Sequence, residues 1–335
     1  MTIALPHFPT AMQWKTAPPR RFPGRANLQL ATCNRQPKTH DVQFQKITVA
    51  GVGLLGGSLG LAVKQRGLAK KVDGLVRRSD SIAECDKFGV VDHATRDPLR
   101  AVENADLVVL CTPIARMREV LQQMLPALKQ GAIVTDVGSA KASVVHELEP
   151  LVAAAGGHFV GSHPMAGAEK MGPGAARPDL FVSAVCVITP TPKSSPEAVA
   201  RVEGFWEAVG AHPLNLTPEA HDDLVSRSSH LPHVVAAELA NYVLSPVHPK
   251  EQALLCANGF RDTTRIASSS PEMWRDIALA NRKNLARVLG VLVEDLKEFQ
   301  LALENADAKT IGEFFEAAKQ RRDAWSGQTA SPSPE

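Results

Sequence analysis

Short apolar runs alternate with longer segments of helical periodicity from residue 46 to residue 190. Runs with the length of strands occupy residues 46–51, 71–76, 106–113, 132–138, 158–162 and 183–190. Segments with the length of helices occupy residues 54–67, 81–89, 114–131 and 140–156. Because strands that alternate with helices pair in parallel through right-handed crossovers, this part of the chain is predicted to form an α/β domain around a parallel sheet.

A glycine-rich turn joins the first predicted strand to the first predicted helix. Gly51, Gly53 and Gly56 form a Gly-x-Gly-x-x-Gly pattern in "VAGVGLLGGSLGLAV". Glycines allow the tight turn and let the backbone approach a pyrophosphate, which binds at the helix N-terminus. The turn therefore predicts a Rossmann-type dinucleotide-binding domain with Gly51, Gly53, Leu54, Leu55 and Gly56 at the cofactor. The alternative is a turn that serves only the packing of helix on sheet.

The end of the second strand bears on which dinucleotide is bound. An acidic residue usually stands there to bind the ribose 2′-hydroxyl of NAD, but Asp73 comes too early, at the start of the strand. The strand end instead holds Arg77, Arg78 and Ser79, and guanidinium groups suit a 2′-phosphate. NADP is therefore favoured over NAD. Two alternatives stay open: the arginines are surface charges, or Asp80 turns towards the ribose.

Polar turns follow three later strands, at the sheet edge where ligands of open α/β folds bind. Residues 111–113 bring Thr112 and Pro113, residues 136–141 bring Ser139, and residues 161–167 bring His163. Each turn offers a polar group near the nicotinamide end of a cofactor. Ser139 is equally well placed to cap the next helix. His163 has fewer structural uses, because no helix begins at it and its neighbours are small.

Strand signals stop after a Pro/Ser-rich connector, and residues 197–210, 219–244, 271–306 and 307–325 have helical periodicity. The third segment is too long for a surface helix of one ordinary domain, so we expect a helical domain that forms a homodimer. The predicted division is a disordered or mis-assigned leader at 1–44, a dinucleotide-binding domain at 45–192, a helical substrate and dimerisation domain at 193–326, and a disordered tail at 327–335.

Composition narrows the class of protein. A net charge of +2 gives no reason to expect nucleic acid, and no apolar run is long enough to cross a bilayer. The five cysteines form no Cys-x-x-Cys pair, which argues against a zinc site and a disulfide framework. We therefore expect a cytoplasmic protein without a metal ion and without a membrane partner.

Five motifs follow one another between residues 46 and 325: "GVGLLGGSLG", "DVGSAK", "GSHPMAGAEKMGPGAA", "SSHLPH" and "GFRDTTRIASSSPEMWRDI". In these motifs the chain resembles the prephenate/arogenate dehydrogenase family of tyrosine biosynthesis. The resemblance implies a Rossmann domain joined to an all-helical dimerisation domain. It also implies NAD(P)-dependent oxidative decarboxylation of a cyclohexadienyl substrate.

The resemblance assigns roles to individual residues. It implies that His163 accepts the proton of the substrate's 4-hydroxyl group, and that Ser139 bonds the same hydroxyl and lies near the nicotinamide. A histidine with a pKa near neutrality suits such a proton acceptor. Arg265 matches the arginine that holds a substrate carboxylate, whereas Arg261 and Arg275 serve as comparators that are equally well explained as surface charges.

Four further substrate-binding residues come from the same resemblance. His233 is expected to line the substrate pocket, and His230 either joins it there or supports the start of a helix. Glu169 matches a glutamate of an ionic gate with the arginine. Trp274 matches a tryptophan that reaches a neighbouring subunit's site, although a plain core aromatic is the alternative.

The identity of the substrate stays open between prephenate and arogenate, which differ by a keto group and an amine. Asp222, Asp223 and Asp262 are the acidic candidates for binding the amine. We favour prephenate, with arogenate or dual use as the alternative. Two remoter hypotheses are a β-hydroxyacid-type dehydrogenase and a non-catalytic nucleotide sensor. A β-hydroxyacid-type dehydrogenase typically uses a lysine of its helical domain, whereas the set His163, Ser139 and Arg265 fits the resemblance above. A sensor needs no proton acceptor, so His163 speaks against it.

Overall fold

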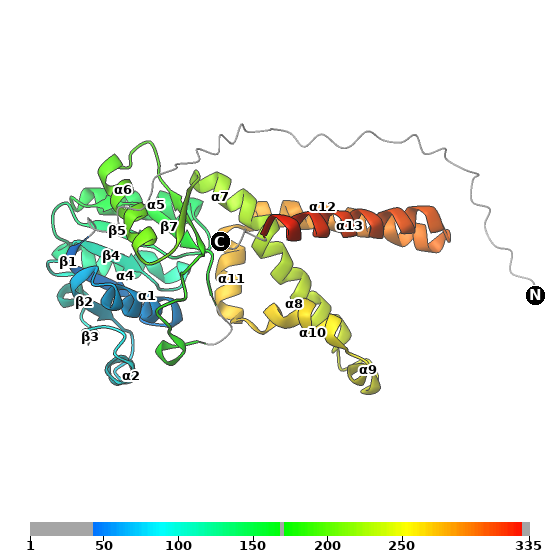
Figure 1. Ribbon diagram of the computed structural model, residues 1–335, viewed down its shortest axis with the longest axis horizontal. Coiled ribbons are helices and arrows are strands. Elements are labelled where there is room, and N and C mark those ends of the chain that lie inside the picture. Colours follow the sequence, from blue (N-terminus) through cyan, green and yellow to red (C-terminus); the bar gives the residue numbers. More distant parts are fainter. Residues whose placement is uncertain (1–42, 168–170, 330–335) are drawn as a thin grey trace, which may run out of the picture. The chain divides into compact units, whose positions relative to one another are not determined.

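The computed structural model describes residues 43–167 and 171–329. Its main sheet has six strands, all parallel, in the order β3-β2-β1-β4-β5-β6 (Figure 1). The strands are β1 Phe44–Ala50, β2 Ala69–Leu75, β3 His93–Thr95, β4 Leu107–Leu110, β5 Ile133–Asp136 and β6 His158–Phe159. This strand order is that of a Rossmann sheet and confirms the predicted fold class.

Helices cover both faces of the sheet, and each face has its own hydrophobic core. The connecting helices are α1 Leu54–Gln65, α2 Asp80–Phe88, α3 Pro98–Val102, α4 Ile114–Met124 and α5 Ala142–Ala154. Leu107 and Val109 of β4 belong to one buried cluster, and Val108 and Leu110 belong to the other. Successive side chains of a strand point to opposite faces, so a strand buried on both faces is an unbroken apolar run.

A second, three-stranded sheet holds the residues around His163. It consists of β7 Gly161–Pro164, β8 Val185–Thr189 and β9 His212–Asn215. β7 pairs antiparallel with β8, and His163 lies opposite Val187. The single strand predicted at 158–162 is therefore wrong: its first half is β6 of the parallel sheet, and after Val160 the chain enters β7. His163 lies within a strand of the second sheet and not in a turn of the first.

A helix and a strand that pack on the two sheets follow residue 192. Helix α6, Pro196–Ala208, buries Phe205 and Trp206 in the core of the first sheet, and β9 pairs in parallel with β8. The prediction that strands end near residue 190 is therefore wrong, because the short β9, "HPLN", carries too few apolar residues to show a pattern. We propose that the first domain extends to Asn215.

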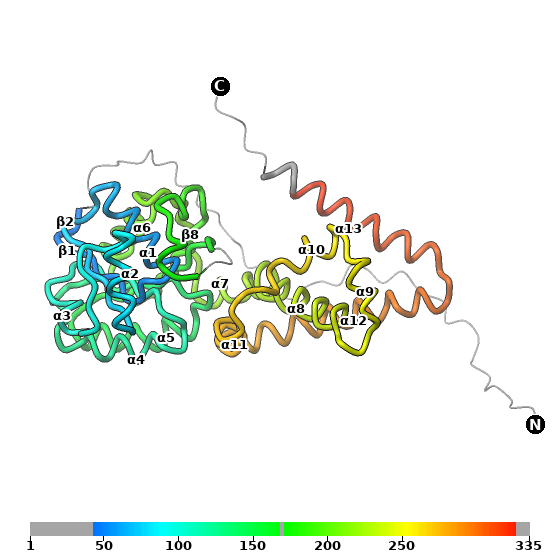
Figure 2. Tube along the Cα trace, turned by 90° about the horizontal axis from the view of Figure 1, so that it is seen from below, coloured from blue at the N-terminus to red at the C-terminus, as the bar shows by residue number. Residues whose placement is uncertain are grey.

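The rest of the described chain is helical. Its elements are α7 Pro218–Val225, a π-helical turn η3 Ser226–His230, α8 Leu231–Val243, α9 Glu251–Leu254, α10 Asn258–Thr264, the 3-10 turn η4 Arg265–Ser268, α11 Pro271–Ala280, α12 Arg282–Glu304 and α13 Ala308–Thr329. The shorter 3-10 turns η1 Leu125–Ala127 and η2 Pro173–Ala175 lie in the first domain. Helix α13 turns back from the end of α12 (Figure 2). Phe299 of α12 and Phe314 of α13 pack together with ring centroids 4.5 Å apart.

Three predicted segments need correction or fall outside the structure. The single helix expected at 271–306 is two helices, because the chain breaks at Asn281, whose side chain is buried. Phe44 of the expected leader opens β1, and α13 includes residues 327–329 of the expected tail. Residues 1–42 and 330–335 lie outside the described residues. Within the described ranges, none of the helices has the length and apolarity needed to span a membrane.

Candidate active site

The glycine-rich turn brings β1 and α1 into close contact. Gly51 has a φ of +100°, and a Cβ there would lie 2.9 Å from the Cys111 backbone. A Cβ on Gly56 would collide with the carbonyl oxygen of Gly51, whereas Gly53 faces open space. Gly53 precedes α1, and no side chain caps that helix. The start of α1 thus has no side-chain cap and open space beside Gly53, which suits the binding of a pyrophosphate.

The opposite end of a bound dinucleotide would meet a basic group at the ends of β2 and β3. Arg77, Arg78 and Ser79 are exposed, as expected. Arg96, which the sequence analysis missed because the short β3 was not predicted, donates from Nε to the carbonyl oxygen of Arg77 at 3.2 Å. Asp73 is buried in an ion pair of 2.8 Å with Lys46, so it does not stand at the ribose position.

The turn after β4 fits the nicotinamide end of the cofactor. Thr112 lies beside Gly51, and its buried Oγ1 has no hydrogen-bond partner among the described residues. Pro113 precedes the first residue of α4, Ile114. An unpaired buried hydroxyl is costly, so Thr112 suits a polar atom of a bound ligand. The residues of both turns therefore fit a dinucleotide.

Ser139 is not a helix cap. Helix α5 begins at Ala142 with Lys141 at its N-cap, two residues beyond Ser139. The cap is supplied from the second domain: the Asp222 carboxylate accepts hydrogen bonds from the amides of Lys141 at 2.7 Å and Ala142 at 3.0 Å. The half-buried Ser139 instead accepts a bond on its carbonyl oxygen from Nε2 of His230, at 3.2 Å. Its hydroxyl is left for another role.

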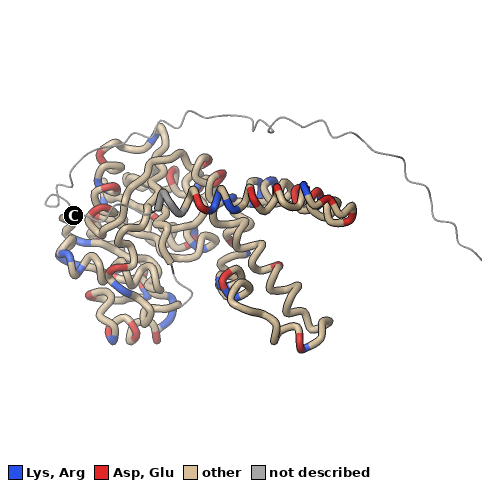
Figure 3. The backbone as a smooth tube through the Cα atoms, turned by 45° about the vertical axis from the view of Figure 1, so that its right-hand side comes forward, with Lys and Arg blue, Asp and Glu red and all other residues tan. Residues whose placement is uncertain are grey.

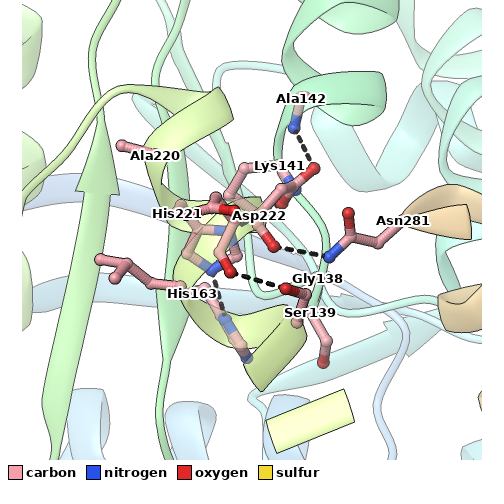
Figure 4. Close-up of polar contacts among 12 residues, drawn as sticks. Gly138, Ser139, Lys141, Ala142, His163, Ala220, His221, Asp222 and Asn281 are labelled. Atoms are coloured by element: carbon pink, nitrogen blue, oxygen red, sulfur yellow. Dashed lines mark hydrogen bonds and ion pairs between the residues drawn. The ribbon is translucent and has the colours of Figure 1, made fainter. Parts of the chain in front are cut away.

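His163 is the first of three hydrogen-bonded groups, shown in Figure 4. Its Nδ1 lies 2.8 Å from Nε2 of His221, whose Nδ1 lies 2.8 Å from Oδ1 of Asp222. A carboxylate only accepts, so Nδ1 of His221 carries the hydrogen and Nε2 of the neutral ring is an acceptor. Nδ1 of His163 must then be the donor. Nε2 of His163 is left with a lone pair and can accept a proton.

Burial keeps these imidazoles neutral. Desolvation, followed by the charges of His221, Lys141 and His230, holds the pKa of His163 well below its usual range. Burial also lowers the pKa of His221, against the opposing effect of its bond to Asp222. A neutral His163 is the form that a general base requires.

A buried ion pair holds the turn of Ser139 against the strand of His163. The Lys141 ammonium, which is fully buried, pairs with Asp136 and donates to the carbonyl oxygen of Ser162 at 3.0 Å. The Asp136 carboxylate also accepts a hydrogen bond of 3.1 Å from the main-chain amide of Ser162. Burial lowers the pKa of Lys141, and Asp136 opposes that shift. The sequence analysis did not identify this pair, although both residues stand in "DVGSAK".

His230 is buried next to the histidine chain. Because Nε2 donates to Ser139, Nδ1 of the neutral ring accepts a hydrogen bond from Nδ2 of Asn281, at 3.2 Å. Burial lowers the pKa of His230 to about 4. Asn281 also donates to the main-chain oxygen of Asp222 at 2.7 Å. His230, the last residue of η3, therefore holds the turn of Ser139 through this bond.

His233, Trp274 and Arg265 form a wall beside His230, whose ring centroid is 6.0 Å from that of Trp274. The His233 ring stacks on Trp274 with centroids 3.7 Å apart, and its Nδ1 donates to the Ser229 carbonyl oxygen. The charge of Arg265 contributes to the lowered pKa of His233, after burial, so the two side chains are near each other. The buried Nε1 of Trp274 has no hydrogen-bond partner among the described residues. These positions agree with a role in binding a polar ligand.

The remaining candidates are the three acidic residues considered for an amine, the two comparator arginines and Glu169. Asp222 is buried and its oxygens are occupied, while Asp223 is half-buried and pairs with Arg227 and Arg287. Asp262 and Arg261 are exposed, and the exposed Arg275 pairs with Asp276 at 2.8 Å. Glu169 lies outside the described residues. Within residues 43–167 and 171–329, no three or more His, Cys, Asp and Glu side chains are grouped so as to hold a metal ion.

Comparison with known proteins agrees with this architecture. A model described as "Prephenate dehydrogenase, nucleotide-binding domain" matches residues 59–215, and one described as "Prephenate dehydrogenase, dimerization domain" matches residues 217–319. A prephenate dehydrogenase of Bacillus subtilis is 34% identical over 83% of this chain and 75% of its own length. A cyclohexadienyl dehydrogenase of Zymomonas mobilis is 34% identical over 83% of this chain and 95% of its own length.

Solved structures give the same result. The prephenate dehydrogenase of Aquifex aeolicus, in complex with hydroxyphenyl propionate and NAD+, superposes with a TM-score of 0.79 at 30% identity and covers 85% of this chain and 99% of its own. Synechocystis arogenate dehydrogenase superposes with a TM-score of 0.71 at 30% identity, and the match covers 84% of this chain and 99% of its own. The chain therefore belongs to the prephenate dehydrogenase family and is an oxidoreductase of the NAD(P)-dependent dehydrogenase type.

Proposed function

We propose that this protein converts prephenate to 4-hydroxyphenylpyruvate by NAD(P)-dependent oxidative decarboxylation in tyrosine biosynthesis. The observation that carries the proposal is the buried, neutral His163, whose Nδ1 is bonded to His221 and whose Nε2 is therefore a proton acceptor. A nucleotide sensor needs no such base. A β-hydroxyacid-type reaction is not favoured, because the polar groups gathered here are His163, Ser139 and the His233–Arg265 wall.

The chemistry assigns a task to each group. His163 accepts the 4-hydroxyl proton while hydride leaves C4 of the ring, and Ser139 orients that hydroxyl. Cleavage of the bond to the C1 carboxylate releases CO2, the electron pair enters the ring, and His163 returns the proton to the phenolate oxygen. The dinucleotide, when bound, supplies the hydride acceptor. General base catalysis of this kind typically contributes ~10²–10⁴-fold to the rate.

Arg265 and His233 are proposed to bind a carboxylate of the substrate. The guanidinium group is exposed and near the His233 ring, and its planar fork matches a carboxylate. Trp274 closes the same wall through its stack on His233, with its unpaired Nε1 as a further donor. We propose Glu169 as a gating residue on the family resemblance alone.

NADP is the proposed cofactor in preference to NAD. Arg77, Arg78 and Arg96 are exposed at neighbouring strand ends, and their summed charge would stabilise a 2′-phosphate. The only nearby carboxylate on this strand, Asp73, is engaged with lysines. Gly51, Gly53 and Gly56 would cradle the pyrophosphate, with Thr112 and Pro113 near the nicotinamide.

Arogenate remains the second candidate substrate, since an arogenate dehydrogenase is among the similar structures. Prephenate is favoured because Asp222, the buried acidic candidate for binding the amine, already accepts bonds from Lys141, Ala142 and His221. The experiment is to incubate the purified protein with either substrate and either cofactor and to record the absorbance of the reduced nicotinamide. Turnover of prephenate with NADP supports the proposal, and no turnover in any of the four combinations would overturn it.

A homodimer through the helical domain is also proposed. Helix α8 carries few charged residues, as Figure 3 shows, and Val235 and Tyr242 on it are exposed. Large apolar side chains that are exposed beyond α8 include Leu244, Val247, Leu254, Leu255, Leu301 and Leu303. Exposed apolar surface on this scale is typical of a contact between subunits. We expect the dimer to be cytoplasmic and to bind no nucleic acid.

A further inference from the structure

We infer that His221 and Asp222 are positioning residues that hold His163 in its reactive tautomer and take up the charge when the substrate proton arrives. The inference rests on the proposed function, and it assigns the proton a route. As Nε2 of His163 gains the hydroxyl proton, Nδ1 passes its own proton to Nε2 of His221. His163 is then neutral again, and the imidazolium of His221 lies against the Asp222 carboxylate. The transfer reverses when the proton returns to the product.

The geometry supports a relay in both hydrogen bonds. Nδ1 of His163 is 2.8 Å from Nε2 of His221, and Nδ1 of His221 is 2.8 Å from Oδ1 of Asp222. The side chains of His221 and Asp222 are almost fully excluded from solvent. Water cannot replace either partner in such a place without a rearrangement. The tautomer of His163 therefore depends on Asp222, through His221.

Charges around the site explain why a relay is needed. The charges of Lys141 and His230 act on His163, and Val187 lies opposite it on β8, while Asp136 is paired with Lys141. The Lys141 charge acts on His221 too, but there Asp222 opposes it. A positive charge that stayed on His163 would be buried next to another cation. Once the proton moves to His221, the same charge is 2.8 Å from a carboxylate. In a medium of low dielectric constant this difference is large.

Asp222 is fixed by more than its bond to His221. Its carboxylate accepts hydrogen bonds from the amides of Lys141 and Ala142 at the start of α5, and its main-chain oxygen accepts one from Nδ2 of Asn281. These three donors fix the position of the carboxylate at the N-terminus of α5. The chain His163–His221–Asp222 thus ends on an anion that the nucleotide-binding domain itself holds in place.

Two variants separate the tautomer role from the charge role. Asp222→Asn replaces an acceptor by a group that can donate to Nδ1 of His221, which reverses both hydrogen bonds and places a hydrogen on Nε2 of His163. We expect kcat to fall about 10²–10⁴-fold, with the KM for prephenate within about three-fold of wild type. His221→Gln still offers an oxygen to Nδ1–H of His163 but cannot take the proton, so a smaller loss of about ten-fold is expected. Asp86→Asn, at an exposed position of α2, is the matched control and should leave kcat unchanged.

A purely structural role would give a different pattern. Loss of the carboxylate should also move the acid limb of the kcat/KM profile of Asp222→Asn to lower pH, since the imidazolium loses its counter-ion. An unmoved limb, or kcat values of both variants within about two-fold of wild type, would overturn the inference. Because Asp222→Asn also weakens the cap of α5, thermal unfolding of each variant is measured alongside.

The tautomer can be read without turnover, which separates this inference from the proposed function. Nitrogen NMR of protein labelled with ¹⁵N-histidine, assigned with His163→Asn, should show the proton of His163 on Nδ1 in the wild type and on Nε2 in Asp222→Asn. If wild-type His163 carries its proton on Nε2, the relay is wrong even if prephenate is turned over. If the NMR result holds but no substrate reacts, the proposed function is wrong and the tautomer assignment stands.

Discussion

The main-chain N–H of Lys141 donates a 2.7 Å hydrogen bond to the carboxylate of Asp222. One residue belongs to the turn of Ser139 and the other to the first helix of the helical domain. The bond therefore joins the two domains at the residues that position His163. The position of the base thus depends on how the second domain packs against the first.

Replacing His163 by Asn tests the base directly. An amide cannot accept the 4-hydroxyl proton, so kcat should fall by about 10²–10⁴-fold while NADP binding is retained. Steady-state kinetics and a fluorescence titration with NADPH measure the two quantities. His158→Asn, at an exposed position of β6, is the control. A His163→Asn enzyme with wild-type kcat would remove this residue from the chemistry.

Arg265→Ala should act on substrate binding. Loss of a charged partner for a carboxylate is expected to raise the KM for prephenate by about ten-fold or more, with a smaller effect on kcat. Arg261→Ala removes an exposed arginine of the preceding helix, α10, and is the matched comparison. An Arg265→Ala enzyme with unchanged KM would show that another group binds the carboxylate.

Arg96→Ala tests the cofactor preference. If Arg96 joins Arg77 at the 2′-phosphate, its loss should raise the KM for NADP by about ten-fold and leave that for NAD within about two-fold. Lys70→Ala removes an exposed charge near the start of the same β2 strand and should change neither. Equal effects on both cofactors would mean that Arg96 does not contact the phosphate.

Acid should destabilise the protein through its buried histidines. In the unfolded chain His230 has its ordinary pKa of 6.5, so it takes up a proton as the pH falls below that value. In the folded protein its pKa is about 4, so the ring stays neutral until the pH approaches 4. Its contribution to stability is complete above 6.5 and is lost as the pH falls towards 4, by up to about 3 kcal/mol. The pKa values of His163 and His221 are lowered too and add in the same direction. Urea unfolding at about pH 7.5 and about pH 5 measures this, and equal stabilities would contradict it.

Asn281 should matter for stability as well as for the site. Its buried amide donates to both Asp222 and His230, so Asn281→Ala removes two hydrogen bonds and leaves Nδ1 of His230 without this donor. The change should cost about 1–3 kcal/mol of unfolding free energy. Gln320→Ala, on the exposed face of α13, should change the free energy of unfolding by less than about 0.5 kcal/mol. A loss no greater than that of the control would mean that these bonds are dispensable.

The sequence allowed much of the fold to be predicted, because buried strands and the glycine turn have local patterns. β4, for example, is an apolar run with both faces buried. β3 and β9 were missed because they are short and, as "HAT" and "HPLN", contain too few apolar residues to form a run. The break at Asn281 was missed because its cause, bonds to Asp222 and His230, is tertiary.

The site was predictable only in part. His163 and Ser139 stand in motifs, but the partners of His163 come from "EAHDD", whose acidic residues look like an ordinary helix surface. Only the packing of α7 on α5 turns His221 and Asp222 inward. Arg96 was missed for a similar reason, since its closeness to Arg77 depends on the pairing of β3 with β2.

The stoichiometry of CO2 to reduced nicotinamide tests the central claim most directly. With prephenate and NADP, oxidation at C4 is coupled to loss of the C1 carboxylate, so one CO2 should form for each NADPH, with 4-hydroxyphenylpyruvate as the product. His163→Asn should slow both products equally. NADPH formed without CO2 would point to a simple alcohol dehydrogenase, and absence of both products would contradict the account.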